Sequence, residues 1–289
     1  GSLHGGDGQS MSPLLVQLGA CIRVNLKYAW RNRLLFVCAL ILVGLTGLQL
    51  IPFFFGFLAE TSTKRFDLVL MLYQRGESFI YMIVALFGLM SLSQEMQNRS
   101  LKLIVTRPCR FETWLAGQYL TAALVVAVCH ALLVAVTGGL FLAWDIPNAP
   151  GLILSSVNAF CQTLIIFGWL MLLSSLLHPI IAVLGALIVQ EGLFHHLLTM
   201  TLAGAETAHA AENTKLAMAL DGLAFLFKGI YLALPSYGPL EKEIGGLRAT
   251  LEVTPATITD LGGIVIYTTV FLAFSFFTTS WILRGRRHT

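Results

Sequence analysis

Long runs of apolar residues, separated by short polar stretches, dominate the pattern of this chain. Six runs are candidate membrane-spanning segments: Leu34–Leu58, Phe79–Leu92, Leu115–Trp144, Leu152–Leu177, Ile180–Leu198 and Thr259–Leu283. A helix needs about 20 apolar residues to cross a hydrocarbon core of roughly 30 Å. The second run is short, and the mostly apolar residues from Val69 predict an earlier start. The pattern predicts an all-α, polytopic membrane protein with about six transmembrane helices.

The segment Leu14–Trp30, before the first long run, has an amphipathic pattern. Its apolar residues recur at helical spacing, and basic residues occupy other positions around the helix. This pattern predicts an N-terminal interfacial helix on the inner leaflet, with a cytoplasmic extension of the first span as the alternative. Gly1–Ser10 precede the first Met and are expected to be a cloning remnant. Residues 11–289 are then expected to form a single transmembrane domain.

The region 199–258 interrupts the regular alternation of spans and short connections. Its apolar part, Asn213–Leu234, contains Lys215, Asp221 and Lys228. A charge at the centre of a bilayer costs about 2.5–3.5 kcal/mol on insertion scales. We therefore expect an outer re-entrant or interfacial helix pair here rather than a seventh span.

Composition agrees with a membrane environment. Apolar residues make up 56% of the chain and charged residues 11%, whereas a soluble domain carries about a quarter charged residues. The five cysteines include no C-x-x-C pair and none in the long outer region. Neither a disulfide framework nor a metal site is expected, and no nucleic-acid partner is expected.

Basic residues predict the orientation. The flank Arg23–Arg33, the connection Arg99–Arg110 and the tail Arg284–Arg287 hold four, four and three of the 18 Lys and Arg residues. In the presumed outer connections, acids balance the bases, as Glu77 balances Arg75. Because short basic flanks stay on the cytoplasmic side, both termini are expected there, in an inner or plasma membrane.

The segment Ser91–Tyr119, between the second and third spans, has the most distinctive local pattern. Glu95 and Arg99 are four residues apart and can pair on one helix face. Arg107–Pro108 then ends that helix, because proline disfavours helical geometry in the residue before it. We expect a short amphipathic helix here, at the cytoplasmic surface.

This segment resembles the corresponding segment of the type-2 class of ABC transporter permeases. Members carry a Glu, an Arg-Thr pair, an Arg-Pro pair and a Gly-Lys pair entering the third span. The matching positions are Glu95, Arg99–Ser100, Arg107–Pro108, Trp114 and Gly117–Gln118. Ser100 and Gln118 depart from the usual Thr and Lys, and Arg110 lies one residue earlier than the expected basic residue.

The resemblance implies the membrane-spanning permease subunit of an ATP-driven ABC exporter. Such permeases pair as homo- or heterodimers, and two cytoplasmic ATPase subunits dock on the helix between spans 2 and 3. It implies a coupling surface of Glu95, Arg99, Leu103 and Arg107, although the positive-inside rule alone also explains the basic residues. No lysine follows a glycine, so the ATPase motif is absent. ATP and Mg would bind the partner subunit, with no cofactor or catalytic residue in this chain.

Polar residues within the apolar runs are candidates for a substrate path, because burying them is costly. They are His130, Asn158, Gln162 and Glu191, and hydrogen bonding between helices is the alternative role. The low charge of the spans favours outward movement of an amphipathic or hydrophobic substrate. Two other functions stay open: an intramembrane metal-dependent enzyme using Glu191, His195 and His196, and a non-transporting membrane scaffold.

Overall fold

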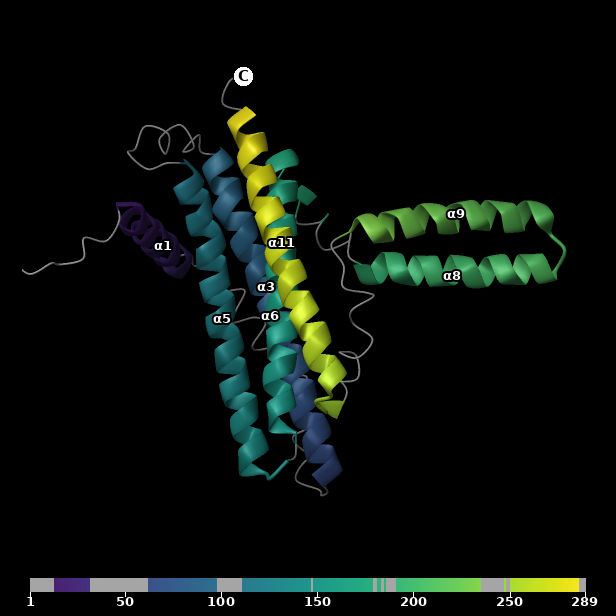
Figure 1. Cartoon of the computed structure of the whole chain (residues 1–289), viewed down its shortest axis with the longest axis horizontal. Coiled ribbons are helices and arrows are strands. Elements are labelled where there is room, and N and C mark those ends of the chain that lie inside the picture. The colour runs from purple at the N-terminus through teal and green to yellow at the C-terminus, as the bar shows by residue number, and fades with distance from the viewer. Residues whose placement is uncertain are drawn as a thin grey trace, which may run out of the picture.

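The computed structural model describes residues 13–31, 62–97, 111–146, 148–178, 181–182, 185, 191–234, 247 and 250–285. These residues form seven helices and no strands, which confirms the all-α prediction for the described part of the chain. The helices are α1 (Pro13–Arg31), α3 (Ser62–Gln97), α5 (Phe111–Ala143), α6 (Ala149–Leu176), α8 (Glu191–Ala210), α9 (Thr214–Ala233) and α11 (Pro255–Gly285). Helices α3, α5, α6 and α11 form an elongated bundle, α1 lies against it, and α8 and α9 project sideways (Figure 1).

Four of the described helices are long and apolar enough to cross a membrane. They are Arg65–Ala85 within α3, and all of α5, α6 and α11. These helices cover the second, third, fourth and sixth predicted spans, and α3 begins even before Val69. The first predicted span, Leu34–Leu58, lies outside the described residues, as does much of Ile180–Leu198. The total of six spans therefore stays a prediction.

The four bundle helices have defined directions. Tyr81 of α3 pairs with Gln162 of α6, and Tyr73, two turns earlier, lies beside Ser155. The residue numbers of the contacting residues increase in the same direction along both helices, so α3 and α6 are parallel. Helix α11 is parallel to α6, whereas α5 runs the opposite way, as its antiparallel course in Figure 1 shows. The C-terminal ends of α3, α6 and α11 therefore share one end of the bundle with the start of α5.

That shared end is also where α1 lies, and we call it the α1 end. Arg284 of α11 pairs there with Glu112 of α5. Helix α1 packs on the first turns of α5, where a Cβ added at Gly117 would lie 2.8 Å from the Cβ of Cys21. The next residue, Gln118, donates a hydrogen bond from Nε2 to Asn25 Oδ1 at 3.2 Å. The predicted N-terminal helix therefore exists and is fixed to α5.

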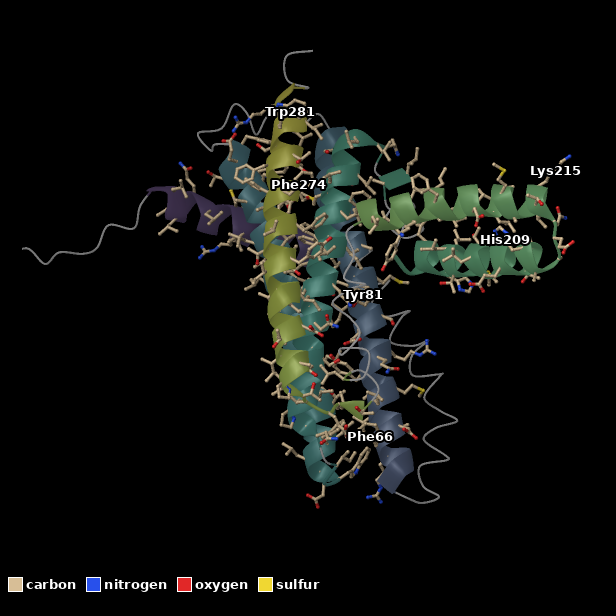
Figure 2. All side chains as sticks on the ribbon, turned by 45° about the vertical axis from the view of Figure 1, so that its right-hand side comes forward. Phe66, Tyr81, His209, Lys215, Phe274 and Trp281 are labelled. Carbon is tan, nitrogen blue, oxygen red and sulfur yellow. The ribbon has the colours of Figure 1, made fainter. Side chains whose placement is uncertain are left out.

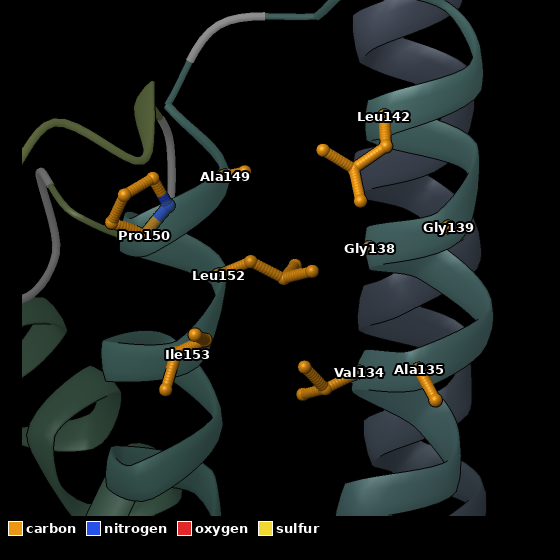
Figure 3. Close-up of a pocket in the computed structure, with 9 residues that line it drawn as sticks. All are labelled: Val134, Ala135, Gly138, Gly139, Leu142, Ala149, Pro150, Leu152 and Ile153. Carbon is orange, nitrogen blue, oxygen red and sulfur yellow. The ribbon is translucent and has the colours of Figure 1, made fainter.

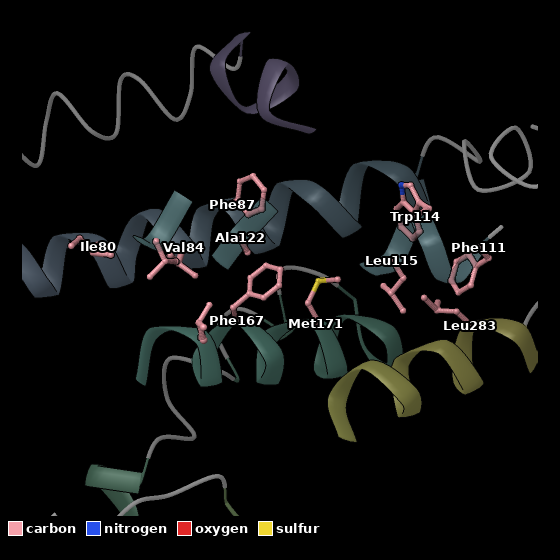
Figure 4. Packing of buried hydrophobic residues seen from close by; sticks show 12 residues of the cluster. Ile80, Val84, Phe87, Phe111, Trp114, Leu115, Ala122, Phe167, Met171 and Leu283 are labelled. Carbon is pink, nitrogen blue, oxygen red and sulfur yellow. The ribbon is translucent and has the colours of Figure 1, made fainter. Parts of the chain in front are cut away.

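The largest cluster of buried apolar side chains joins α3, α5, α6 and α11 (Figure 4). Aromatic contacts are prominent: the Phe167 ring centroid lies 6.2 Å from Phe87 and 5.5 Å from Tyr119. Between α6 and α11, Ser275 Oγ donates to the Gly168 carbonyl at 2.6 Å. In a lipid environment the hydrophobic effect does not drive helices together, so close packing at small residues and hydrogen bonds between helices stabilise the bundle.

Helices α8 and α9 form a hairpin through the turn at Ala211–Asn213, with His209 near the end of α8 and Lys215 near the start of α9 (Figure 2). Asn213 Oδ1 accepts a hydrogen bond from the Leu216 backbone at 3.3 Å and thereby caps α9. Small residues, including Ala205, Ala208, Ala217 and Ala224, are buried where the two helices meet. The predicted helix pair is present, but it begins at Glu191, before residue 199. Its re-entrant or interfacial position stays a prediction.

Candidate functional site

Three of the four predicted path residues lie in the bundle. His130 of α5 is 4% exposed and Asn158 of α6 is fully buried, and Gln162 follows Asn158 by about one turn. Glu191 instead begins α8, beyond the bundle, and its side chain lies outside the described part of the structure. The structure therefore brings His130, Asn158 and Gln162 into one region and leaves Glu191 apart from them.

Helix α3 contributes residues that the sequence interpretation missed. Tyr73, Glu77 and Tyr81 are four residues apart and share one helix face. Tyr73 is 1% exposed and Glu77 6% exposed, so Glu77 does not lie in an outer connection as expected. The Tyr81 hydroxyl donates to Gln162 Oε1 at 2.8 Å. The regular spacing of these three residues was the signal available in the sequence.

The contacts of Tyr73 extend this group towards α5. Its hydroxyl lies beside Glu77 of α3 and beside Ser155 and Ser156 of α6. Ser156 Oγ lies 3.4 Å from His130 Nδ1, within hydrogen-bond range. Residues from three helices thus form one group, which we call the buried polar cluster: Tyr73, Glu77, Tyr81, His130, Ser155, Ser156, Asn158 and Gln162.

Several atoms of the buried polar cluster have no hydrogen-bond partner among the described residues. They are Nε2 of His130, both side-chain amide atoms of Asn158 and Oγ of Ser155. Leaving a buried donor or acceptor unpaired costs about 1–3 kcal/mol. Buried polar groups in a membrane segment are expensive and usually functional. The cluster therefore has hydrogen-bonding capacity that the described residues do not use.

An apolar crevice opens between α5 and α6 close to this cluster. Its volume is about 440 Å³, and Leu142, Val134 and Leu152 point into the space between the two helices (Figure 3). Gly138 and Gly139 leave room on the α5 side, since nothing lies within 4 Å of a Cβ added at Gly139. The other lining residues are Ala135, Ala149, Pro150 and Ile153. The crevice can accept hydrocarbon.

The predicted coupling residues are only partly placed. Glu95 lies in the last turn of α3, and its side chain is outside the described part. Arg99, Leu103 and Arg107 belong to the connection 98–110, which lies wholly outside the described residues. The two ends of this connection, at Gln97 and Phe111, both lie at the α1 end of the bundle.

Metal chemistry gains no support within the described residues. No group of three or more His, Cys, Asp or Glu side chains there is placed to hold a metal ion. The side chains of Glu191 and His195, on which the metal-enzyme hypothesis depends, lie outside that part of the structure.

No known family model and no curated protein matches this chain. Its function has to be inferred from its residues and their arrangement.

Proposed function

We propose that this chain is the membrane-spanning permease subunit of an ATP-driven ABC exporter of the type-2 class. One observation carries the proposal most directly. The three basic segments expected in the cytoplasm, on α1, between α3 and α5, and after α11, all adjoin the α1 end of the bundle. The segment that resembles the docking segment of such permeases is one of them. A single face at this end is thus available to a cytoplasmic partner.

The opposite end of the bundle supports the same orientation. Among the described residues, the exposed basic side chains on this part of the bundle are Arg65 and Arg75, and exposed Asp67, Asp145 and Glu252 accompany them. Under the positive-inside rule, this end faces outward and both termini are cytoplasmic. Six spans would also need Leu34–Leu58, which lies outside the described residues, and Ile180–Leu198, whose last part from Glu191 lies in α8.

The bundle offers a route from the docking segment to the interior. The connection 98–110 continues into α3 on one side and α5 on the other, and both helices contribute to the buried polar cluster. A rigid-body shift of these two helices against α6 would alter the Tyr81–Gln162 and His130–Ser156 contacts. Closure of two ATP-binding subunits on Glu95, Arg99, Leu103 and Arg107 would supply that shift in the proposed complex.

The substrate class follows from the lining of the bundle. The polar cluster is small, and the crevice beside it is apolar. This combination suits an amphipathic or hydrophobic molecule moved outward better than a hydrophilic ion. A second copy of the chain would complete the permease.

Affinity purification in mild detergent tests the proposal. We expect the native chain to retain a cytoplasmic ATPase with a P-loop, and an Arg99→Glu/Arg107→Glu variant to lose it, because charge reversal replaces attraction with repulsion. The matched control is Arg65→Glu/Arg75→Glu, which reverses two exposed charges on the outward part of α3. Retention of the ATPase by the folded inner variant, or its loss from the control, contradicts the proposed docking surface.

A further inference from the structure

The α5–α6 crevice and the buried polar cluster adjoin one another. Val134 and Leu152 line the crevice, and His130 and Ser156 lie four residues from them on the same helix faces. Across the interface, a Cβ at Gly138 would lie 3.8 Å from Leu152 Cδ2, and His130 lies 3.4 Å from Ser156. The His130–Ser156 pair therefore lies one helical turn beyond the end of the crevice.

The crevice has the size and chemistry of a hydrocarbon site. Its lining side chains are all apolar, and two of them, Leu142 and Ile153, are 76% and 55% exposed. A volume of about 440 Å³ is within the range of roughly 300–1,000 Å³ typical of small-molecule sites. Along α5, the lining from Val134 to Leu142 extends over about 12 Å at 1.5 Å per residue. An elongated space of this kind suits a single hydrocarbon chain.

The polar pair at its end suits an uncharged head. His130 is 4% exposed, and its Nε2 atom has no partner among the described residues. This atom is buried beyond the lining of the crevice, so a ligand hydroxyl or amide recovers the hydrogen bond that it lacks when the side chains at this end of the crevice move aside. The cluster includes the carboxyl group of Glu77 and no Lys or Arg. A phosphate or carboxylate head would therefore be buried without a compensating cation.

We propose that the α5–α6 crevice and the His130–Ser156 pair form a binding site for a single-chain amphiphile with an uncharged, hydroxyl-bearing head. The hydrocarbon chain occupies the crevice, and the head hydrogen bonds to His130 and Ser156. Binding needs no ATPase. The role of this amphiphile as the exported substrate rests on the proposed function, whereas its binding does not.

Photolabelling with a monoacylglycerol that carries a diazirine in its chain tests the site. The probe is added to the purified full chain in detergent without ATPase, and labelled residues are mapped by mass spectrometry. We expect labels on Val134–Leu142 and Ala149–Ile153, competed by unlabelled monoacylglycerol. Gly139→Leu places a side chain in open space and replaces glycine by a better helix former, so the variant should fold. We expect it to reduce labelling of the crevice about tenfold or more. Ala135→Leu is a second blocking variant.

Gly262→Leu is the matched control for the blocking variants. Gly262 lies on α11, is exposed and also has nothing within 4 Å of an added Cβ, so labelling of the crevice should be unchanged. His130→Phe keeps an aromatic ring but removes both nitrogens, and we expect about tenfold weaker binding. Fatty-acid and lysophosphatidylcholine probes should bind more weakly than the monoacylglycerol.

Five outcomes would overturn the proposal. Equal labelling of the native chain and both blocking variants, or labels spread evenly over α5 and α11, would indicate lipid at the bundle surface only. Unchanged binding by His130→Phe, or tighter binding of a charged-head probe, would refute the assigned head chemistry. Protection of Gly139→Cys from a thiol reagent without added monoacylglycerol, in several detergents of different chain length and in a chain lacking the native cysteines, would show that another part of the chain fills the crevice. None of these results affects co-purification of the ATPase. The proposed amphiphile site and the proposed permease function can therefore be refuted independently of each other.

Discussion

Asn158 is a single buried residue whose polar side-chain groups do not contribute hydrogen bonds to the described fold. It is fully buried on α6, three residues after Ser155 and four before Gln162, on the face that meets α3. Its amide atoms have no hydrogen-bond partner among the described residues. An unsatisfied buried amide lowers stability, so a purely structural position would favour an apolar residue of similar size.

We predict that Asn158→Leu leaves the stability of the folded chain unchanged or raises it, by as much as about 1–3 kcal/mol, because it removes an unpaired polar group. Unfolding by sodium dodecyl sulfate in mixed micelles measures the change. Thr163→Val on the same helix is the control, since Thr163 Oγ1 already bonds the Ala159 carbonyl at 2.7 Å and its loss should be nearly neutral. A large loss of stability in Asn158→Leu would show that Asn158 is a structural residue.

Ser275 presents the opposite case, a polar residue whose hydrogen bonds are complete. Its hydroxyl contacts the Gly168 carbonyl at 2.6 Å and the Tyr119 hydroxyl at 2.8 Å, and so joins α11 to α6 and α5. Ser275→Ala should lower the free energy of unfolding by about 0.6 kcal/mol and by no more than about 1.7 kcal/mol, the average and the maximum found for hydrogen bonds between membrane helices. Thr269→Val, at an exposed position on α11, should change it much less. Equal effects of both variants would contradict the bridging role.

The residues of the buried polar cluster differed in how well the sequence predicted them. His130, Asn158 and Gln162 stand out as polar residues inside long apolar runs, and the structure places all three in the bundle, while their role in a substrate path stays a prediction. Tyr73 and Glu77 lie in a stretch with Arg75, where nearby charges suggested an outer boundary. Their spacing of four residues predicts a shared helix face, but only the packing of α3 on α6 shows that this face is buried.

At the element scale, the contact between α1 and α5 depends on a residue without a side chain. Gly117→Leu should separate the two helices, because even a Cβ at Gly117 would lie 2.8 Å from the Cβ of Cys21. Faster hydrogen–deuterium exchange of residues 13–31 would report the separation. Gly19→Leu, on α1 in open space, is the matched control and should leave exchange unchanged. Unchanged exchange in Gly117→Leu would show that α1 does not pack on α5 in this way.

The start of α6 depends on a similarly close approach. A Cβ at Gly151 would overlap the backbone carbonyl of Leu251, a residue that itself has a φ of 56°. We expect Gly151→Ala to lower the free energy of unfolding by about 1–3 kcal/mol or more, the usual cost of overpacking. Gly139→Ala, with open space around it, should be neutral or stabilising by up to about 1 kcal/mol. Thermal unfolding in detergent compares the two, and a neutral Gly151→Ala would contradict the observed contact.

Sequence patterns predicted most elements because span length and amphipathic spacing are local properties. Helix α3 is longer than its apolar run, since the polar residues before Val69 continue the helix beyond the apolar segment. The hairpin of α8 and α9 was expected from the charges in Asn213–Leu234, but its start at Glu191 was not. That boundary depends on packing between the two helices, which no local pattern encodes.

For the whole molecule, the direction of the helices is the feature that ties structure to the proposed function. Three parallel helices and one antiparallel helix place at one end the helix termini that carry or lead into the basic segments expected in the cytoplasm. Charge counts predicted this sidedness, whereas the contacts that hold α3, α5 and α6 around the polar cluster required the structure. The proposed function therefore depends most on whether a cytoplasmic ATPase binds at the α1 end.

Site-specific photocross-linking from residue 103 tests that claim most directly. A photoreactive amino acid replaces Leu103 in the full chain, and cross-linked partners are identified from intact cells by mass spectrometry. The proposed permease should yield a cross-link to a P-loop ATPase from Leu103 and none from a matched substitution at Leu142, at the opposite end of the bundle. Cross-links to the same ATPase from both positions, or none from Leu103 while the chain is folded in the membrane, would contradict the account.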